Sequence, residues 1–229
     1  MIDIVVTTCE RLPLLQQSLD CLRERTVTPY RLRVVDDAST EGNAEYLRAE
    51  YAAGRVASIH LHRRRVGIAS HLRALLRITE SDPVVVADDD ILCPQLAPDW
   101  LARGLAAMEQ LPTLGLLALN NPQCTLDASR GPKTPVGEVT LCRNVGATFL
   151  FVRRAVLAAC QPSDGERSPV KRLCLLAAAA GWQVGYLSDV YCQHIGAVSV
   201  RTGTDQGAAL ALVAPVHPYT LEPADEYKG

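Results

Sequence analysis

Three adjacent aspartates, Asp88, Asp89 and Asp90, follow a short apolar run of three valines and Ala87 in "PVVVADDDILCP", residues 83–94. Carboxylates this close repel one another, and each raises the pKa of its neighbours. Water and salt screen that repulsion on a solvated loop, whereas at the mouth of a cleft a cation has to cancel it. Asp88 and Asp90 are two residues apart, so on an extended backbone their side chains point the same way. Such a pair suits Mg²⁺ or Mn²⁺, which prefer oxygen ligands; the alternative is an acidic surface turn.

Other polar stretches carry residue types that can bind a nucleotide or a metal. Asp36 and Asp37 in "VVDDAST" can cap the following helix, or one carboxylate can accept a hydrogen bond from a nucleotide base or ribose. The basic run "HRRRV", residues 62–66, is either solvated or able to hold a diphosphate. His194 in "CQHIG" is either a structural residue or a nitrogen ligand to a metal held by the aspartates.

The elements that must position these residues alternate along the first half of the chain. Short β-branched runs predict strands at residues 2–8, 31–37, 56–62 and 83–88, and apolar residues at helical spacing predict helices at 12–25, 43–54 and 67–79. Nearly all-apolar strands that alternate with helices are typical of a parallel sheet covered on both faces. Ligands of such sheets bind outside the carboxyl ends of the strands. The polar stretches lie at those ends, so we expect them to share one cleft.

The second half is less regular. It predicts a helix at 99–111, a strand at 115–121, a turn-rich excursion at 121–138, a strand followed by a helix within 144–160, a helix at 170–181 and a strand at 182–189. No repeat or linker divides the chain, so we expect a single domain, 1–229. Its nucleotide-binding half is expected at about 1–95, its acceptor half at 96–200, and a lid or tail at 201–229.

Composition narrows the class of protein. The chain is 48% hydrophobic and 21% charged over 229 residues, which suits one sizeable core, and its net charge of −2 favours neither nucleic acid nor a membrane surface. The N-terminus lacks a signal-peptide pattern, and the longest apolar run is too short for a membrane span. Eight cysteines without a C-x-x-C pair suit reduced thiols. We therefore expect a cytoplasmic protein, and its excess of arginine over lysine hints at a GC-rich bacterial genome.

Five segments in order carry a resemblance to a known family. They are "IVVTTCERLPLLQQSLDCL", "VVDDAST", "RRVGIASHLRALL", "VVVADDDI" and "GWQVGYLSDVYCQHIG". Together they resemble the GT-A fold glycosyltransferases, most closely the large family-2 group, over about residues 2–197. The resemblance implies an α/β, Rossmann-like three-layer sandwich with a mostly parallel central sheet. It also implies a glycosyltransferase of the hexosyltransferase type.

The same resemblance implies roles for residues at the nucleotide. Thr7, Cys9 and Arg11 would lie along the base and ribose. Asp37 would hydrogen-bond the base, and Arg65 would lie near the base or the diphosphate. The donor would be a nucleotide sugar, with a UDP-sugar favoured and a GDP-sugar possible, while the acceptor stays unnamed.

At the sugar and the metal, Asp88 would contact the ribose or the sugar, and Asp89 would also face the donor. Asp90, either alone or together with Asp89, would bind Mn²⁺ or Mg²⁺ at the donor diphosphate, and His194 would complete the coordination shell. Such a cation neutralises charge on the departing nucleoside diphosphate. Ala87 stands where many relatives have an aspartate. The alignment of the motif can therefore shift by one residue, which leaves open which of the three aspartates binds the metal.

The general base is where the sequence departs from the family. Inverting members usually carry an acidic pair at the start of the helix before the final strand, and the matching positions here are Pro169 and Val170. The nearest carboxylates are Glu166, our first choice as the catalytic base, and Asp164, our second. An absent base would suit a retaining mechanism or a catalytically degraded copy.

The expected function is metal-dependent transfer of a sugar from a nucleotide-diphosphate sugar to an acceptor hydroxyl. A non-catalytic nucleotide-sugar-binding protein is the first alternative, since it would keep the aspartates and lack a base. A sugar-nucleotide pyrophosphorylase is less favoured, because it needs a glycine-rich phosphate loop after the first strand and no glycine precedes Gly42.

Overall fold

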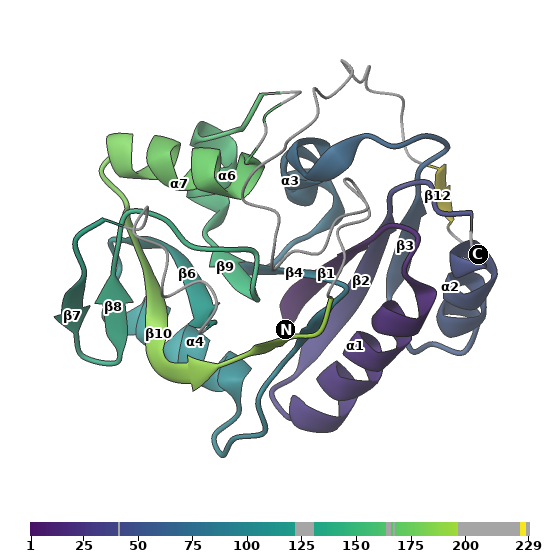
Figure 1. The fold of residues 1–229 in the computed structure, drawn as a ribbon, viewed down its shortest axis with the longest axis horizontal. Coiled ribbons are helices and arrows are strands. Elements are labelled where there is room, and N and C mark those ends of the chain that lie inside the picture. The colour runs from purple at the N-terminus through teal and green to yellow at the C-terminus, as the bar shows by residue number, and fades with distance from the viewer. Residues whose placement is uncertain (41, 122–130, 164–165, 167, 197–224, 228–229) are drawn as a thin grey trace.

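The computed structural model describes residues 1–40, 42–121, 131–163, 166, 168–196 and 225–227. Its first half alternates strands and helices: β1 (Ile2–Thr8), α1 (Leu12–Arg25), β2 (Tyr30–Asp36), α2 (Asn43–Ala52), β3 (Ser58–Leu61), α3 (Gly67–Ile78) and β4 (Val84–Asp88) (Figure 1). The second half contains β5 (Ile91–Leu92), α4 (Trp100–Gln110), β6 (Leu114–Asn120), β7 (Thr134–Val136), β8 (Val139–Leu141), β9 (Leu150–Val152), α6 (Arg154–Ala159), α7 (Pro169–Ala179), β10 (Gln183–Tyr191), β11 (Gln193–His194) and β12 (Asp225–Tyr227).

One large sheet runs through the molecule in the order β12-β3-β2-β1-β4-β9-β6-β10-β8-β7. Strands β3, β2, β1 and β4 pair in parallel, and so do β6 and β10. Strand β9 is antiparallel to both β4 and β6, so these two parallel groups point in the same direction. The predicted α/β class with a mostly parallel central sheet is confirmed.

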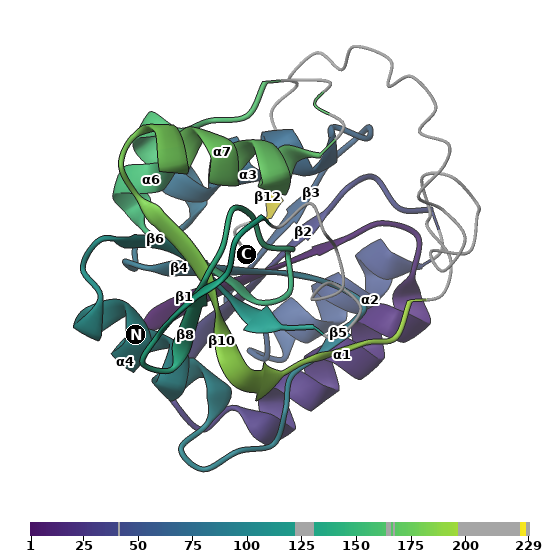
Figure 2. The ribbon, with the colours of Figure 1, turned by 60° about the vertical axis from the view of Figure 1, so that its left-hand side comes forward.

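Helices cover both faces of this sheet, as the alternation of side chains along β1 requires. Ile4 and Val6 join a buried apolar cluster with residues of α1, α2 and α4. Val5 points to the opposite face and joins a second cluster with residues of α3, α6 and α7. Figures 1 and 2 show these two sets of helices on opposite sides of the strands. The result is the three-layer sandwich expected from the sequence.

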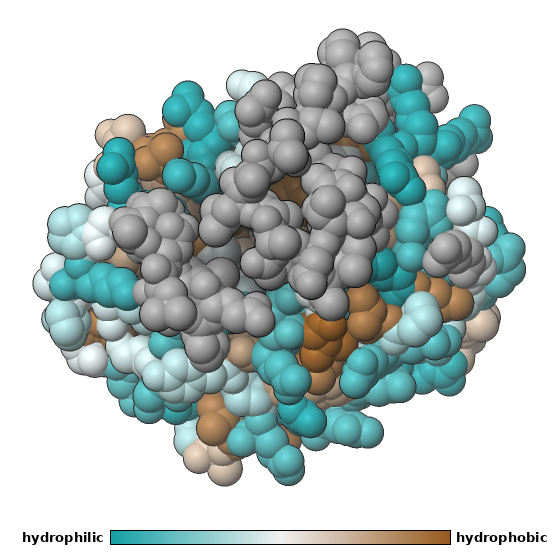
Figure 3. All heavy atoms as spheres, viewed as in Figure 1, coloured by the Kyte–Doolittle hydropathy of each residue, from teal (hydrophilic) through white to brown (hydrophobic). Residues whose placement is uncertain are grey.

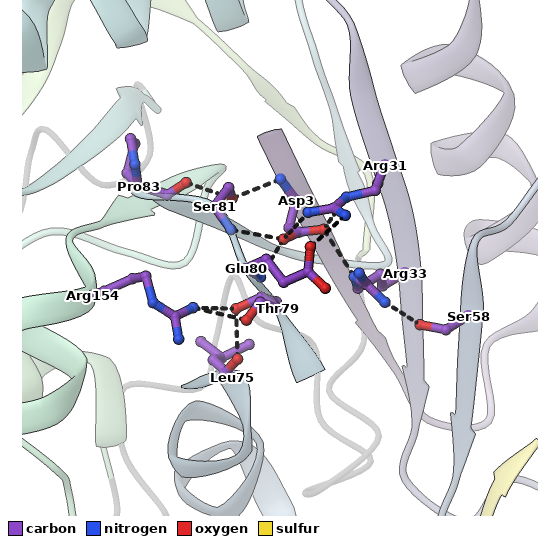
Figure 4. A network of polar contacts seen from close by, with 10 residues as sticks. All are labelled: Asp3, Arg31, Arg33, Ser58, Leu75, Thr79, Glu80, Ser81, Pro83 and Arg154. Carbon is purple, nitrogen blue, oxygen red and sulfur yellow. Dashed lines mark hydrogen bonds and ion pairs between the residues drawn. The ribbon is translucent and has the colours of Figure 1, made fainter. Parts of the chain in front are cut away.

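A buried ion-pair network fixes the amino ends of the first strands (Figure 4). Asp3 is fully buried, and it accepts hydrogen bonds from Arg33 Nε at 2.9 Å and Arg31 Nη2 at 3.1 Å. The N–H groups of Glu80 and Ser81 donate to its Oδ2 at 2.6 and 3.0 Å. Burial alone would raise the pKa of Asp3, but these N–H groups and Arg33 outweigh it and hold the pKa below its usual range. The network therefore ties β1 and β2 to the turn before β4.

The excursion predicted at residues 121–138 holds a hairpin that the sequence analysis missed. Within it and just beyond it, β7 pairs with β8, and β8 continues the sheet antiparallel to β10. Residues 122–130 lie outside the described residues. Most of the predicted lid or tail, 201–229, also lies outside them, apart from β12, which pairs antiparallel with β3.

The face seen in Figure 3 carries mostly polar side chains around its edge, with apolar side chains in separate patches. Among the helices of the described residues, none combines the length and the apolar character that a membrane crossing requires.

Candidate functional site

The carboxyl ends of β1, β2 and β4 meet at one edge of the sheet. In the strand registers, Thr8 of β1 lies opposite Asp36 of β2, and Thr7 lies opposite Asp88 of β4. The polar residues that follow β2 and β4 therefore flank the end of β1. Asp37 and Asp90 lie at the same edge of the sheet and not on opposite faces of the molecule, since residues 8–11 contact both: Thr8 O accepts the Asp37 N–H at 2.9 Å, and Arg11 pairs with Asp90.

The aspartate triplet is buried and is held by the two threonines that end β1. Asp89 and Asp90 are almost fully buried and Asp88 is half-buried. Thr7 Oγ1 donates to Asp88 Oδ1 at 3.3 Å, and Thr8 Oγ1 donates to Asp89 Oδ2 at 2.6 Å. The sequence analysis did not single out Thr8, although it adjoins Thr7 in "TTCER". The triplet is thus a packed acidic site and not a solvated surface turn.

Burial and the repulsion between neighbouring charges raise the pKa values of Asp88 and Asp89. Burial, followed by the charges of Asp90 and Asp89, raises the pKa of Asp88 to about 7. Burial also raises the pKa of Asp89 to about 6, against the opposing effects of Arg11 and Thr8. A cluster of carboxyls with raised pKa values at the end of a buried strand is typical of a functional site.

Arg11 lies directly on the aspartates. One Nη atom contacts Asp89 Oδ1, and the other donates to Asp90 Oδ2 at 2.5 Å. Burial lowers the pKa of Arg11, but Asp89 and Asp90 outweigh it and raise the pKa, so the guanidinium stays charged. The resemblance implied a place for Arg11 along the base and ribose, whereas in this structure it bridges two carboxylates.

His194 and Gly196 lie against Asp90 Oδ2, the oxygen that Arg11 also contacts. Strand β11 pairs with β5 so that His194 lies opposite Ile91, and the Ile195 N–H donates to the Asp90 carbonyl at 2.9 Å. This pairing brings His194 Nε2 to 3.4 Å from Asp90 Oδ2. A Cβ on Gly196 would lie 2.2 Å from the same oxygen, so only glycine fits there. The sequence analysis missed Gly196, whose only signal is its place after the histidine in "CQHIG".

The residues present fit a divalent cation. Asp90 Oδ1 is buried without a hydrogen-bond partner, and a buried carboxylate oxygen is rarely left unpaired. An aspartate oxygen and a nearby imidazole are donors that Mn²⁺ and Mg²⁺ accept. Within the described part of the chain, no three His, Cys, Asp or Glu side chains converge as a ready metal cage.

Asp37 binds the start of α3. The Val66 N–H donates to Asp37 Oδ1 at 2.6 Å, the Gly67 N–H donates to Oδ2 at 3.0 Å, and His71 Nε2 lies 3.5 Å from Oδ1. Burial alone would raise the pKa of Asp37, but His71 and the two N–H groups outweigh it and lower the pKa. Asp37 is therefore an ionised acceptor that joins the end of β2 to α3.

The alternative that Asp36 and Asp37 cap the following helix does not hold. The residue preceding α2 is Gly42, and no side chain caps that helix. Asp36 instead accepts hydrogen bonds from the Ser39 N–H at 3.0 Å and from Ser39 Oγ at 2.5 Å. It closes a local turn beside the site.

Cys9 and Arg65 lie beside Asp37. Cys9 Sγ donates to the Asp37 carbonyl at 3.4 Å, and burial raises the pKa of this thiol to about 11, so it is neutral. Arg65 is partly exposed, and its Nη2 lies 3.1 Å from Glu10 Oε1. Glu10 also accepts the Thr40 N–H at 2.9 Å. Arg65 is thus held at the rim, where its charge faces solvent.

Two stacked histidines lie beside Asp37, and the sequence analysis did not identify them. The rings of His62 and His71 are 5.3 Å apart between centroids and 20° from parallel. Burial, followed by the charge of His71, lowers the pKa of His62 to about 4, so its ring is neutral at physiological pH. Ring stacking between distant chain positions leaves no periodic signal in the sequence.

The two candidate bases precede α7. Asp164 lies outside the described residues, whereas the Glu166 N–H donates to the Ser163 carbonyl at 3.4 Å. The first turn of α7 contains no acidic residue. Arg73 of α3 donates to the Pro162 carbonyl at 2.9 Å, which anchors the start of the segment that carries both candidates.

Comparison with known proteins agrees with this architecture. Residues 3–122, more than half of the 229 residues, match the family model described as glycosyl transferase family 2. No curated protein sequence matches the chain significantly. The chain is similar to the mannosyltransferase PcManGT from Pyrobaculum calidifontis, solved in complex with GDP-Man and Mn²⁺, with a TM-score of 0.69 and 22% identity over 88% of this chain and 58% of that one.

It is also similar to S. aureus TarS 1-349 in complex with UDP-GlcNAc, with a TM-score of 0.60 and 15% identity over 87% of this chain and 62% of that one. The chain therefore spans less than two thirds of each of these structures. The likeness confirms the predicted GT-A architecture.

Proposed function

Because the chain belongs to glycosyltransferase family 2, we propose that it is an enzyme that transfers a sugar from a nucleoside-diphosphate sugar to an acceptor hydroxyl with the help of Mn²⁺ or Mg²⁺. The observation that carries this proposal is the buried, unpartnered Oδ1 of Asp90, just beyond the carboxyl end of β4. The other oxygen of the same carboxylate, Oδ2, lies 3.4 Å from His194 Nε2. Ligands of open α/β sheets bind at that edge.

Asp90 and His194 would hold the cation. When bound, it would neutralise charge on the departing nucleoside diphosphate. The chain's own contribution is to keep Asp90 in place. Its backbone carbonyl accepts the Ile195 N–H, and its Oδ2 is enclosed by Arg11 and Gly196. The Mn²⁺ in the mannosyltransferase complex supports a divalent cation at a site of this architecture.

The nucleotide would lie along the ends of β1 and β2. Thr7, Cys9 and Asp37 are held there by hydrogen bonds. Arg65 offers a solvent-facing charge suited to a base or diphosphate. Asp88 would contact the ribose or the sugar, and Asp89 would belong to the donor site beside it. The similar structures hold GDP-Man in one case and UDP-GlcNAc in the other, which supports a nucleotide-sugar donor. We keep UDP as first choice for the nucleotide and GDP as second.

The acceptor hydroxyl needs a base within hydrogen-bond reach, directly or through one water. Glu166 is our first choice and Asp164 our second. Support for this assignment comes from α7, whose first turn lacks an acidic residue and so leaves the preceding segment as the nearest source of a carboxylate. The same lack of an acid favours the alternative function, a protein that binds a nucleotide sugar without turning it over.

We keep a cytoplasmic location as part of the proposal. The seven cysteines among the described residues are all free thiols, which suits a reducing compartment.

A donor panel tests the proposal directly. UDP-, GDP- and dTDP-sugars are added to the protein with and without Mn²⁺, and the unfolding temperature is recorded. A donor at 100 times its Kd should raise the free energy of unfolding by about 2.7 kcal/mol, which corresponds to roughly 5–10 °C for a chain of this size. If no donor stabilises the protein in the presence of Mn²⁺, the proposed function is wrong. Metal-dependent release of the nucleoside diphosphate then separates an enzyme from a binding protein.

A further inference from the structure

The two carboxylates that Arg11 bridges differ in how many of their oxygens have a hydrogen-bond partner. Asp89 has both oxygens engaged, because Arg11 contacts Oδ1 and Thr8 Oγ1 donates to Oδ2 at 2.6 Å. Asp90 receives the other arm of the guanidinium on Oδ2 at 2.5 Å, while its Oδ1 is buried without a partner. Arg11 is therefore fixed at Asp89 and shares only one oxygen of Asp90.

A divalent cation and Arg11 would compete for Asp90. Asp90 is only 1% exposed, so a cation bound there would be a few ångströms from the charged guanidinium with little water between them. Like charges this close repel strongly where water is excluded. The cation can bind well only if Arg11 leaves Asp90, and its contact with Asp89 gives the side chain a second place to stay.

We propose that Arg11 is an internal counter-ion, a positioning residue that occupies Asp90 in the ligand-free protein and gives up that carboxylate when the cation and nucleotide arrive. The inference rests on the proposed function, because it needs a cation at Asp90. Arg11 keeps its contact with Asp89, and the arm that it frees gains a phosphate oxygen as its new partner, a geometry that the guanidinium fork favours. The cation alone then binds weakly, and the nucleoside diphosphate strengthens its binding.

The test is a titration of Mn²⁺ alone, followed by the electron paramagnetic resonance signal of the free ion. Arg11→Met removes the charge and keeps much of the side-chain volume. Arg103→Met is the matched control, since it removes one positive charge from a surface pair with Asp189 and Glu138. We expect Arg11→Met to bind Mn²⁺ about tenfold or more tightly than the wild type and the control, a normal size for coupled binding.

A second arm repeats the titration with UDP and with GDP. The nucleotide should strengthen Mn²⁺ binding in the wild type and do so less in Arg11→Met, where no guanidinium has to be displaced. If Mn²⁺ alone binds Arg11→Met no more tightly than Arg103→Met, the counter-ion proposal is wrong. If neither nucleotide strengthens Mn²⁺ binding to the wild type, the proposed donor site is wrong, and the titration without nucleotide still decides the role of Arg11.

Removal of Arg11 leaves Asp89 buried beside Thr8, so a measurement on the wild type guards against a variant that fails to fold. The Arg11 Nε signal is assigned in side-chain ¹⁵N spectra by its loss in Arg11→Lys. It should shift when Mg²⁺ is added together with UDP or GDP, because the guanidinium exchanges a carboxylate for a phosphate. A signal that stays unchanged with both nucleotides overturns the proposal.

Discussion

Gly196 lies so close to Asp90 that no side chain fits between them: a Cβ at position 196 would be 2.2 Å from Asp90 Oδ2 and 3.1 Å from Arg11 Nη1. Heavy atoms in van der Waals contact are about 3.5–4.0 Å apart. The backbone at Gly196 therefore packs directly against the carboxylate, and this contact restricts the rotation of the Asp90 side chain.

Gly196→Ala should displace Asp90 and weaken Mn²⁺-dependent nucleotide binding by about tenfold, with a loss of about 1–3 kcal/mol in the free energy of unfolding, as is usual for overpacking. Calorimetry with Mn²⁺ and UDP measures the first effect and urea unfolding the second. Gly54→Ala is the control, because Gly54 has a φ of +69° and no neighbour within 4 Å, so alanine strains only the backbone. Equal nucleotide binding by both variants would contradict a role for the contact between Gly196 and Asp90.

Asp90→Ala and His194→Ala should both lose Mn²⁺-dependent donor binding while staying folded. Removal of a group that merely orients a ligand typically reduces metal affinity by about 10–100-fold, and a direct ligand is expected at the upper end or beyond. Calorimetric titration of Mn²⁺ together with UDP measures the loss. Asp189→Ala is the matched control, since Asp189 is an exposed carboxylate paired with Arg103. Unchanged binding in both site variants would show that the buried triplet and His194 do not bind the cation.

Glu166→Gln should lower the rate of sugar transfer by at least about 100-fold, the lower range for loss of a general base. Donor affinity should hardly change, because the proposed partner of Glu166 is the acceptor. Asp164→Asn is measured beside it as the second candidate. Transfer assays need an acceptor found by screening. Full activity in both variants would mean that the base lies elsewhere or that the enzyme uses none.

Asp3→Asn should destabilise the protein by about 3–5 kcal/mol at neutral pH, because it breaks a buried ion-pair network and removes the carboxylate that Arg33 pairs with, while Arg31 keeps Glu80. The folded-state pKa of Asp3 lies below its ordinary value. Its contribution is therefore fully present above the unfolded pKa of about 3.9 and is lost as the pH falls through the lower folded value.

Urea unfolding of the wild type and Asp3→Asn at a series of pH values checks this prediction. The difference between the two proteins should shrink on acidification below about pH 4, the unfolded pKa of an aspartate. Other carboxylates titrate in both proteins and cancel in the difference. A constant difference across that range would mean that Asp3 acts through packing and not through its charge.

The sequence predicted the first half of the fold closely because each element there carries its own local signal. The expected strand 2–8 and helix 12–25 match β1 and α1, since a β-branched run and a helical apolar repeat each indicate one structure. Hairpin β7–β8 was missed because Pro135 and Gly137 within it are typical of turns. Strands this short are stabilised by the sheet they join and not by their own sequence.

The sequence predicted which residues belong to the candidate site better than it predicted the contacts that they make. Parallel strands place the aspartates, Thr7 and Asp37 at one edge of the sheet, and the parallel direction was predicted from the alternating pattern. The sequence pattern does not predict which group each side chain contacts. That Arg11 turns onto Asp90, or that Asp37 binds the start of α3, depends on distances set by packing far along the chain.

Strand β9 has a consequence for the order in which the chain assembles. It lies between β4 and β6, yet it is made after β6, so the two parallel groups cannot be joined until residues 150–152 are in place. The β3-β2-β1-β4 group closes through local crossovers and can form early, whereas the union with β6 and β10 depends on distant contacts, which form slowly. A chain still emerging from the ribosome can thus hold its aspartates on a formed sheet edge before the strand that carries His194 reaches them.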